Sequence, residues 1–200
     1  MNSASSAFAN IGQQDAQNPL NFRGDRSVGD FDMRQRWVTS FLYQIPLAGN
    51  LLGNWELGGI FKMQAGEPFS IMSGQDNSLS GVGFDRANVV GDWTRSHTSR
   101  SDLIQRYFNT AAFQANASGT FGNSGRNILT APGSVNLDVS LSKAFRFRER
   151  HRLQLRGDAF NILNKPNFSA PNGTLTSPAF GRITGASSGR IMQVSMKYQF

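Results

Sequence analysis

The sequence predicts an all-β fold of about five long antiparallel strands, and three observations support this prediction. Five segments alternate apolar and polar residues with a period of two, which is the pattern of strands whose two faces meet different surroundings. Short and long connections alternate between these segments. Aromatic residues gather at the segment ends that adjoin the short connections.

The predicted strands are residues 37–45, 54–65, 134–148, 152–163 and 192–200. In the third strand the alternation breaks only at Lys143, which falls on the apolar side. Its long stem can lie along an apolar surface, so we expect its ammonium to reach toward an interface. The fourth strand loses its phase at residues 160–162, where we expect a β-bulge.

The connections and strand lengths favour a transmembrane β-barrel wall. Strands that span a bilayer have about 9–11 residues, and outer-membrane barrels join them by short periplasmic turns and long extracellular loops. Here the short links are residues 46–52 and 149–151, and the long ones are about 67–133 and 164–189. We therefore expect an extracellular loop region at 1–31, barrel strands and their loops at 32–200, and a periplasmic C-terminus.

An aromatic level supports the same interpretation, because barrels carry aromatic girdles at the membrane interfaces. The predicted periplasmic girdle consists of Tyr43, Trp55, Phe145, Phe147, Tyr198 and Phe200. On the opposite, polar face, Asp138, Arg156 and Asp158 are candidates for an ion network in the lumen that braces the wall.

Two alternatives come from other classes of protein. A soluble or surface-attached β-sandwich binding module also alternates apolar and polar residues, but strand length, connection parity and the aromatic level favour a barrel. The net charge of +7 and a pI near 10.5 could indicate a nucleic-acid-binding module. Its arginines are scattered and no aromatic platform is interleaved with them, so we expect no nucleic-acid partner.

No catalytic, cofactor or metal site is predicted, and the protein is not expected to be an enzyme. Cysteine is absent, and the two histidines, His97 and His151, fall in a long loop and a tight turn. The run from Asp76 to Ser78 has too few of the ligands that a calcium loop requires, so a polar loop tip is expected there.

The C-terminal alternation resembles the signal that the barrel-assembly machinery recognises in outer-membrane proteins. Its positions are Met192, Val194, Met196, Tyr198 and Phe200. The resemblance implies that this machinery is a partner of the protein.

Six further segments resemble the C-terminal region of Oar-like TonB-dependent outer-membrane transporters, the type that carries a carboxypeptidase-regulatory-like domain. They are DFDMRQRW (30–37), LGNWELGGI (52–60), QAGEPF (64–69), YFNTAAF (107–113), GTFGNSGRN (119–127) and DAFNILNKPNF (158–168). The resemblance runs from about residue 18 to residue 200. It implies a barrel of about 22 strands around an N-terminal plug, energy-dependent uptake through the TonB complex, and a Gram-negative outer membrane.

The chain departs from that family in having no plug, no TonB-contacting segment and too few strands to close a barrel. We therefore expect it to be part of a transporter, either the product of a gene fragment or a truncated chain. Its expected partners are outer-membrane lipid, the remaining barrel strands and the plug, with TonB engaged through the missing part. The transported substrate is not predicted.

Overall fold

The structure is a computed structural model, and it describes residues 16–47, 49, 53–81, 83, 85–147 and 151–200. The chain divides into two compact units. The sheet unit comprises Gln35–Ala65, Gly133–Asn167 and Ser187–Phe200. The loop unit comprises Met1–Arg34, Gly66–Pro132 and Phe168–Ala186. Each unit is therefore assembled from three stretches of sequence.

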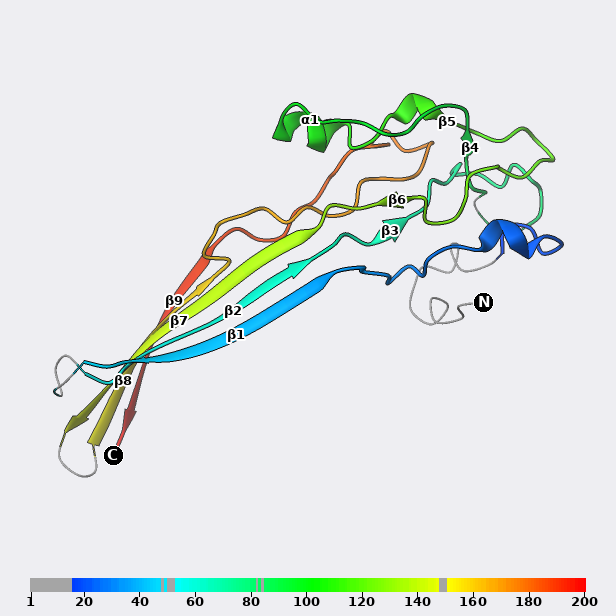
Figure 1. The fold of residues 1–200 in the computed structure, drawn as a ribbon. Coiled ribbons are helices and arrows are strands. Elements are labelled where there is room, and N and C mark those ends of the chain that lie inside the picture. The colour runs from blue at the N-terminus through cyan, green and yellow to red at the C-terminus, as the bar shows by residue number, and fades with distance from the viewer. Residues whose placement is uncertain (1–15, 48, 50–52, 82, 84, 148–150) are drawn as a thin grey trace. The chain divides into compact units, whose positions relative to one another are not determined.

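The sheet unit is a five-stranded antiparallel sheet (Figure 1). Its strands, in spatial order, are β1 (Arg36–Ile45), β2 (Trp55–Gln64), β7 (Ser134–Phe147), β8 (His151–Phe160) and β9 (Ile191–Gln199). Each strand pairs with the next one in this order. The five predicted strands and the all-β fold class are confirmed.

The connections leave the sheet at opposite ends. Ile45 pairs with Trp55 and Phe147 pairs with His151, so both short links close one end of the sheet. Gln64 pairs with Ser134, so the long stretch between these two residues leaves from the other end. Asn54 directly precedes β2 and has φ 60°, a left-handed conformation that asparagine tolerates better than most residues. Because this conformation is not extended, the strand begins at the next residue, Trp55.

The loss of phase in the fourth predicted strand coincides with the end of that strand. β8 ends at Phe160 and does not continue to residue 163. Asn161 takes a left-handed conformation with φ 49°. The Ile162 N–H then donates to the Leu137 carbonyl, one residue out of step with the β7–β8 register. A single left-handed residue therefore shifts the phase and ends the strand.

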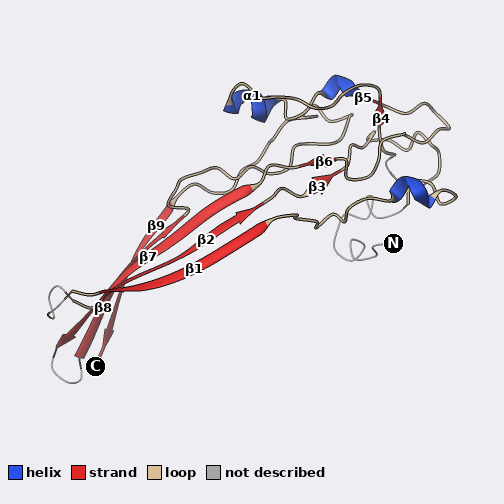
Figure 2. Ribbon diagram, in the orientation of Figure 1, coloured by secondary structure: helices blue, strands red, loops and turns tan. Residues whose placement is uncertain are grey.

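The loop unit consists of short helices and strands joined by loops (Figure 2). Its elements are η3 (Phe22–Asp25), β3 (Pro68–Phe69), β4 (Asn88–Val89), α1 (Arg100–Gln105), η4 (Thr110–Ala112), β5 (Phe113–Gln114) and β6 (Leu129–Thr130). β3 pairs with β6 and β4 pairs with β5, both antiparallel.

The core of the loop unit is largely aromatic. Phe108 is 2% exposed and meets Phe113 and Phe180 edge to face, with ring centroids 5.6 and 5.3 Å apart. Ile71 and Ala87 are fully buried beside them. Phe180 belongs to the second long connection, so the core joins segments that are far apart in the sequence. Within the described ranges, no helix is long and apolar enough to cross a membrane.

Candidate functional site

The sheet register places apolar residues on one face. Successive side chains of a strand point to opposite faces, and direct cross-strand partners share a face. One row on this face is Phe41, Gly59, Val139, Ala159 and Met192, and the next is Tyr43, Leu57, Leu141, Gly157 and Val194. This continuous apolar surface crosses all five strands.

Many large apolar side chains of this face are exposed in the described chain. Val194 is 84% exposed, Met192 74% and Met196 71%. β1 contributes Trp37 and Phe41, which are also exposed. Contiguous apolar surface on this scale is rare on soluble proteins and marks contact with lipid or with another protein.

The structure brings the six aromatic residues predicted for the girdle to the end of the sheet that carries the short links. Phe145 stacks on Phe147 with ring centroids 6.2 Å apart, and Tyr198 lies 6.1 Å from Phe200. Tyr43 and Trp55 lie on β1 and β2 at the same end. The Tyr198 hydroxyl is also 2.7 Å from Nδ1 of His151, a neighbour that the sequence did not indicate. Their position at a membrane interface stays a prediction.

Lys143 lies inside this aromatic level. Its ammonium is 4.7 Å from the centroid of the Trp55 ring and 4.9 Å from that of Phe145. The residue is only 4% exposed. Cation–π attraction to both rings explains how a lysine is accommodated on the apolar face.

The opposite face carries most of the polar side chains of the sheet, together with five exposed apolar ones, Val38, Leu42, Ile60, Phe160 and Ile191. The row beside the one that holds Lys143 consists of Gln44, Glu56, Ser142, Arg156 and Ser195. Of the three residues predicted to form an ion network, the structure joins two. The Arg156 Nε donates to both carboxylate oxygens of Asp158, at 2.9 and 3.1 Å.

Asp138, the third residue, lies on the same face but has other partners. Its Oδ1 accepts from the Asn136 side chain at 2.8 Å and from the Asn161 N–H at 2.9 Å. It therefore fixes the turn that ends β8.

The end of the sheet opposite the aromatic level is fastened by asparagines, a feature that the sequence analysis did not identify. Asn161 is 6% exposed, and its amide donates to the carbonyls of Lys165 and Ser188. Asn167 bonds both the N–H and the carbonyl of Val135. The Asn164 Oδ1 accepts from the Arg190 N–H. These bonds join the ends of β7, β8 and β9. In the sequence, the only indication of this role is that the three asparagines follow one another at intervals of three residues.

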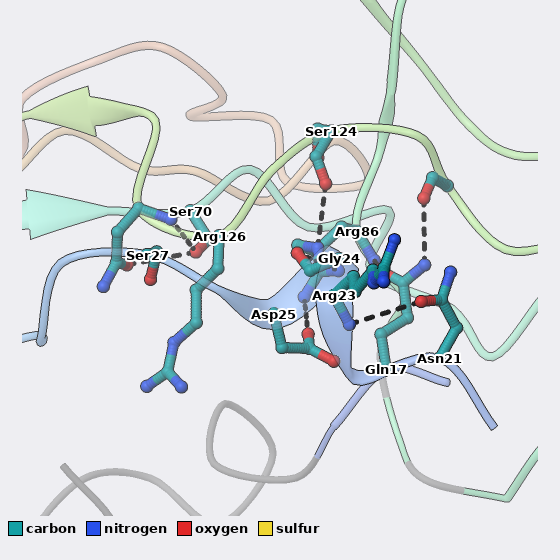
Figure 3. Close-up of polar contacts among 12 residues, drawn as sticks. Gln17, Asn21, Arg23, Gly24, Asp25, Ser27, Ser70, Arg86, Ser124 and Arg126 are labelled. Carbon is teal, nitrogen blue, oxygen red and sulfur yellow. Dashed lines mark hydrogen bonds and ion pairs between the residues drawn. The ribbon is translucent and has the colours of Figure 1, made fainter. Parts of the chain in front are cut away.

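In the loop unit, a polar clamp holds residues 16–34 against the long segment Gly66–Pro132. Arg86 forms an ion pair with Asp25, and its Nε donates to the Ser124 carbonyl at 2.9 Å, as Figure 3 shows. The backbone N–H of Arg86 donates to Gln17, whose amide donates to the Gly122 carbonyl. The Arg86 and Asp25 side chains are only 9% and 14% exposed.

A second set of bonds extends the clamp. Asp30 pairs with Arg126 at 2.7 Å and accepts from the Asn127 amide at 2.6 Å. Asn127 also bonds Ser70 through its N–H. Gly122 passes so close to Arg86 that a Cβ there would lie 1.8 Å from the Arg86 carbonyl oxygen, so only glycine fits. Residues of the two segments DFDMRQRW and GTFGNSGRN therefore meet in space.

Two carboxylates organise the polar loops of this unit. Asp85 is 3% exposed and accepts from the Ser78 N–H and the Asn116 amide at 2.6 and 2.8 Å. Asp76 lies nearby, and the N–H of Gly81 is the main cause that lowers the pKa of its carboxyl. These bonds are internal to the loop, in agreement with the polar loop tip expected at residues 76–78.

The segment around α1 carries a third carboxylate. The Arg95 side chain donates to Asp102 at 2.7 Å and is the main cause that lowers the pKa of this carboxyl. Ser99 caps the helix by accepting from the Asp102 N–H. Burial raises the pKa of Tyr107, whose hydroxyl donates to the Thr130 carbonyl.

Comparison with known proteins agrees with the two-faced sheet. Residues 1–193 match the family model of the outer membrane beta barrel domain. No curated protein and no solved structure gives a significant match. The match covers nearly the whole chain and supports a location in the outer membrane. The chain belongs to the outer membrane beta barrel domain family.

Proposed function

We propose that the chain forms part of the barrel wall of a TonB-dependent outer-membrane transporter of the Oar-like type, and that its role is in uptake and not in catalysis. The observation that carries this proposal is the order and spacing of the six segments between residues 30 and 168 that resemble this class. The clamp adds support, because residues of two of these segments bond each other there.

Further strands are required to complete the wall. Among the described residues, β1 and β9 are the two edges of the sheet. Unpaired backbone N–H and C=O groups cost several kcal/mol each in lipid, so only closed barrels are stable there. Five strands are fewer than the roughly eight of the smallest common barrels. We propose that strands outside the described sheet pair with β1 and β9.

The proposed orientation puts the short links and the C-terminus in the periplasm and the stretch 67–133 outside the cell. Single-cysteine labelling tests it, because the chain contains no cysteine. Val90 in the long stretch and Leu47 in a short link are 53% and 52% exposed. In intact cells a membrane-impermeant maleimide should label Val90→Cys, and Leu47→Cys should react only after the outer membrane is permeabilised. The reverse pattern would invert the proposed orientation.

Transport needs a separate experiment. If the protein works with TonB, loss of its gene and loss of TonB should abolish uptake of a shared nutrient, and a protonophore should do the same in wild-type cells. A screen of carbon, metal and peptide sources in the two deletion strains identifies that nutrient. If uptake survives the loss of TonB, the proposal of energy-dependent transport is wrong, and the protein is a structural barrel or a passive pore.

A further inference from the structure

Residues 20–34 of the loop unit direct two of their acidic side chains inward. The Asp25 and Asp30 side chains are only 14% and 18% exposed, and they pair with Arg86 and Arg126 of the long segment. Figure 3 shows the Asp25 carboxylate beside the guanidinium of Arg86. Both carboxylates are therefore compensated within the unit and add no net charge to its surface.

The remaining charged side chains of residues 20–34 are exposed. They are Arg23, Arg26, Asp32 and Arg34. Within the described part of the chain, none of the three arginines forms an ion pair. Three arginines against one aspartate give this exposed side of the segment a net charge of +2.

The large apolar side chains of the same residues are exposed as well. Leu20 is 95% exposed, Phe22 and Phe31 are each 52% exposed, and Val28 is 36% exposed. No described residue of this segment belongs to the aromatic core of the loop unit. The polar clamp therefore holds the segment, while its apolar side chains stay outside the core. Apolar side chains that gather on an exposed surface mark a contact with lipid or with another protein.

The chain keeps these residues near one end of a membrane strand. Only Gln35 separates Arg34 from β1, and Phe31 stands five residues before Arg36, the first residue of that strand. Since an extended chain spans at most about 3.6 Å per residue, Phe31 lies within about 18 Å of the beginning of β1. Trp37 is the first residue of β1 on the apolar face and is 62% exposed, as expected for an indole at a membrane interface.

From these observations we infer that residues 20–34 bind the anionic lipid surface of the outer leaflet, where lipopolysaccharide carries phosphoryl groups beside its acyl chains. The inference rests on the proposed function and its orientation, which puts this end of β1 on the outer side of the membrane. The exposed arginines attract the phosphoryl groups and form charge-assisted hydrogen bonds with them. Leu20, Phe22 and Phe31 enter the boundary between headgroups and acyl chains, as apolar residues of basic interfacial segments do.

A lipid surface accounts for the arrangement of the segment better than a protein partner does. Basic and apolar residues follow each other along the chain, with Phe22 beside Arg23 and Val28 close to Arg26. A lipid layer offers phosphoryl groups and acyl chains together over an extended area. The short connection to β1 also keeps the segment at the level where this layer is always present.

Photo-crosslinking of the full chain in isolated outer membranes tests the inference. The photoreactive residue p-benzoylphenylalanine replaces Phe22 in one variant and Phe31 in a second. The matched control is the same replacement at Val90, which is 53% exposed in the same unit and whose nearest charged neighbour in the sequence is Asp92. After irradiation and purification, we expect lipopolysaccharide adducts, detected by immunoblot, at Phe22 and Phe31 but not at Val90.

Charge variants show whether the arginines hold the lipid. Arg23→Gln combined with Arg26→Gln should lower the adduct yield at Phe22 by roughly tenfold. Neither side chain takes part in the bonds of Arg86, so the clamp stays intact. Arg100→Gln removes an exposed arginine of α1 in the same unit and should leave the yield unchanged. A yield that does not depend on Arg23 and Arg26, equal adducts at Val90, or adducts with protein alone overturn the inference.

The maleimide labelling of Val90→Cys and Leu47→Cys separates this failure from failure of the proposed orientation. If Val90→Cys is labelled in intact cells and no lipopolysaccharide adduct forms, the orientation stands and the lipid contact is wrong. Adducts with phospholipid alone also overturn the inference. If they occur together with a reversed labelling pattern, the orientation is wrong as well.

Discussion

Single asparagines shape the backbone at several points of this protein. Asn54, Asn127, Asn161 and Asn164 all have φ between 49° and 60°, in the left-handed region. Asparagine tolerates this region better than most residues because its short polar side chain can bond locally. Asn127, Asn161 and Asn164 also use their side chains to bond other segments. Each of these three residues therefore sets a turn and holds a distant strand or loop in place.

Asn161→Ala should lower the free energy of unfolding by about 1–3 kcal/mol, because it removes buried hydrogen bonds to Lys165 and Ser188 and puts alanine in a left-handed conformation. The measurement is the midpoint of urea unfolding of the detergent-purified protein, followed by loss of the heat-modifiable band. Asn161→Gly is the matched control, since glycine accepts the backbone conformation but loses the same bonds. If alanine and glycine both match the wild type, the asparagine does not fasten the strand ends.

Asp102 should make the α1 segment sensitive to acid. The Arg95 bond lowers the pKa of its carboxyl from the ordinary value of 3.8. A carboxyl with a depressed pKa in the folded state contributes stability that is present above its unfolded pKa and is lost as the pH falls through the folded pKa. Proteolysis within residues 100–105 by an acid-active protease should therefore increase as the pH falls below 3.8. Asp102→Asn should remove this dependence, and an unchanged pH profile would contradict the assignment.

At the scale of elements, the long strands can be predicted from their own residues, whereas the short ones cannot. The five long strands alternate between two faces over nine to fourteen residues each, so their alternation can be recognised from the sequence alone. β3, β4, β5 and β6 have two residues each, too few to show any period. They form where the buried core brings their backbones together.

The ion pair between Arg86 and Asp25 should be the critical contact of the polar clamp. Asp25→Ala leaves a largely buried guanidinium without its counter-ion, which costs about 3–5 kcal/mol at buried sites. We expect local release of residues 16–34, measured as faster trypsin cleavage at Arg26 and Arg34 in the folded protein. The double variant Asp25→Ala with Arg86→Met should restore protection, because no unpaired charge remains. Equal cleavage in the wild type and Asp25→Ala would argue against the clamp.

At the scale of the whole molecule, the sheet unit joins a lipid-compatible face to a charged polar face. The two faces come from one alternating pattern, and the register of four strand pairs keeps them in phase. A shift of one residue in any pair would move the apolar set of that strand to the polar side. Correct assembly into the outer membrane therefore depends on how the strands are recognised and paired.

Phe200 should matter for that assembly, because the alternation from Met192 to Phe200 resembles the signal read by the barrel-assembly machinery. Deletion of Phe200, or Phe200→Ala, should lower the abundance of the protein in the outer membrane severalfold, measured by immunoblot of isolated membranes. Phe200→Tyr keeps a terminal aromatic ring and should preserve most of it. Unchanged abundance and heat-modifiability in Phe200→Ala would show that the terminal ring is not read.

The sequence by itself determined the fold class, the five long strands, their two faces and the end of the sheet at which the aromatic residues gather. These features follow from local alternation and connection length, which each strand carries in its own residues. The core around Phe108 was not accessible in this way, and neither were the clamp between Arg86 and Asp25 or the bond from the Asn161 N–H to Asp138.

Only the tertiary structure decided those contacts, because they join residues far apart in the chain whose meeting depends on how several loops fold together. The clamp links residues separated by 61 positions, and the asparagine bonds between Asn167 and Val135 cross 32. The end of β8 is a further feature that could not be predicted from the sequence, because it also depends on contacts with another strand. The sequence indicated a loss of phase at residues 160–162, but only the bonds to Asp138 and Leu137 decided that the strand stops there.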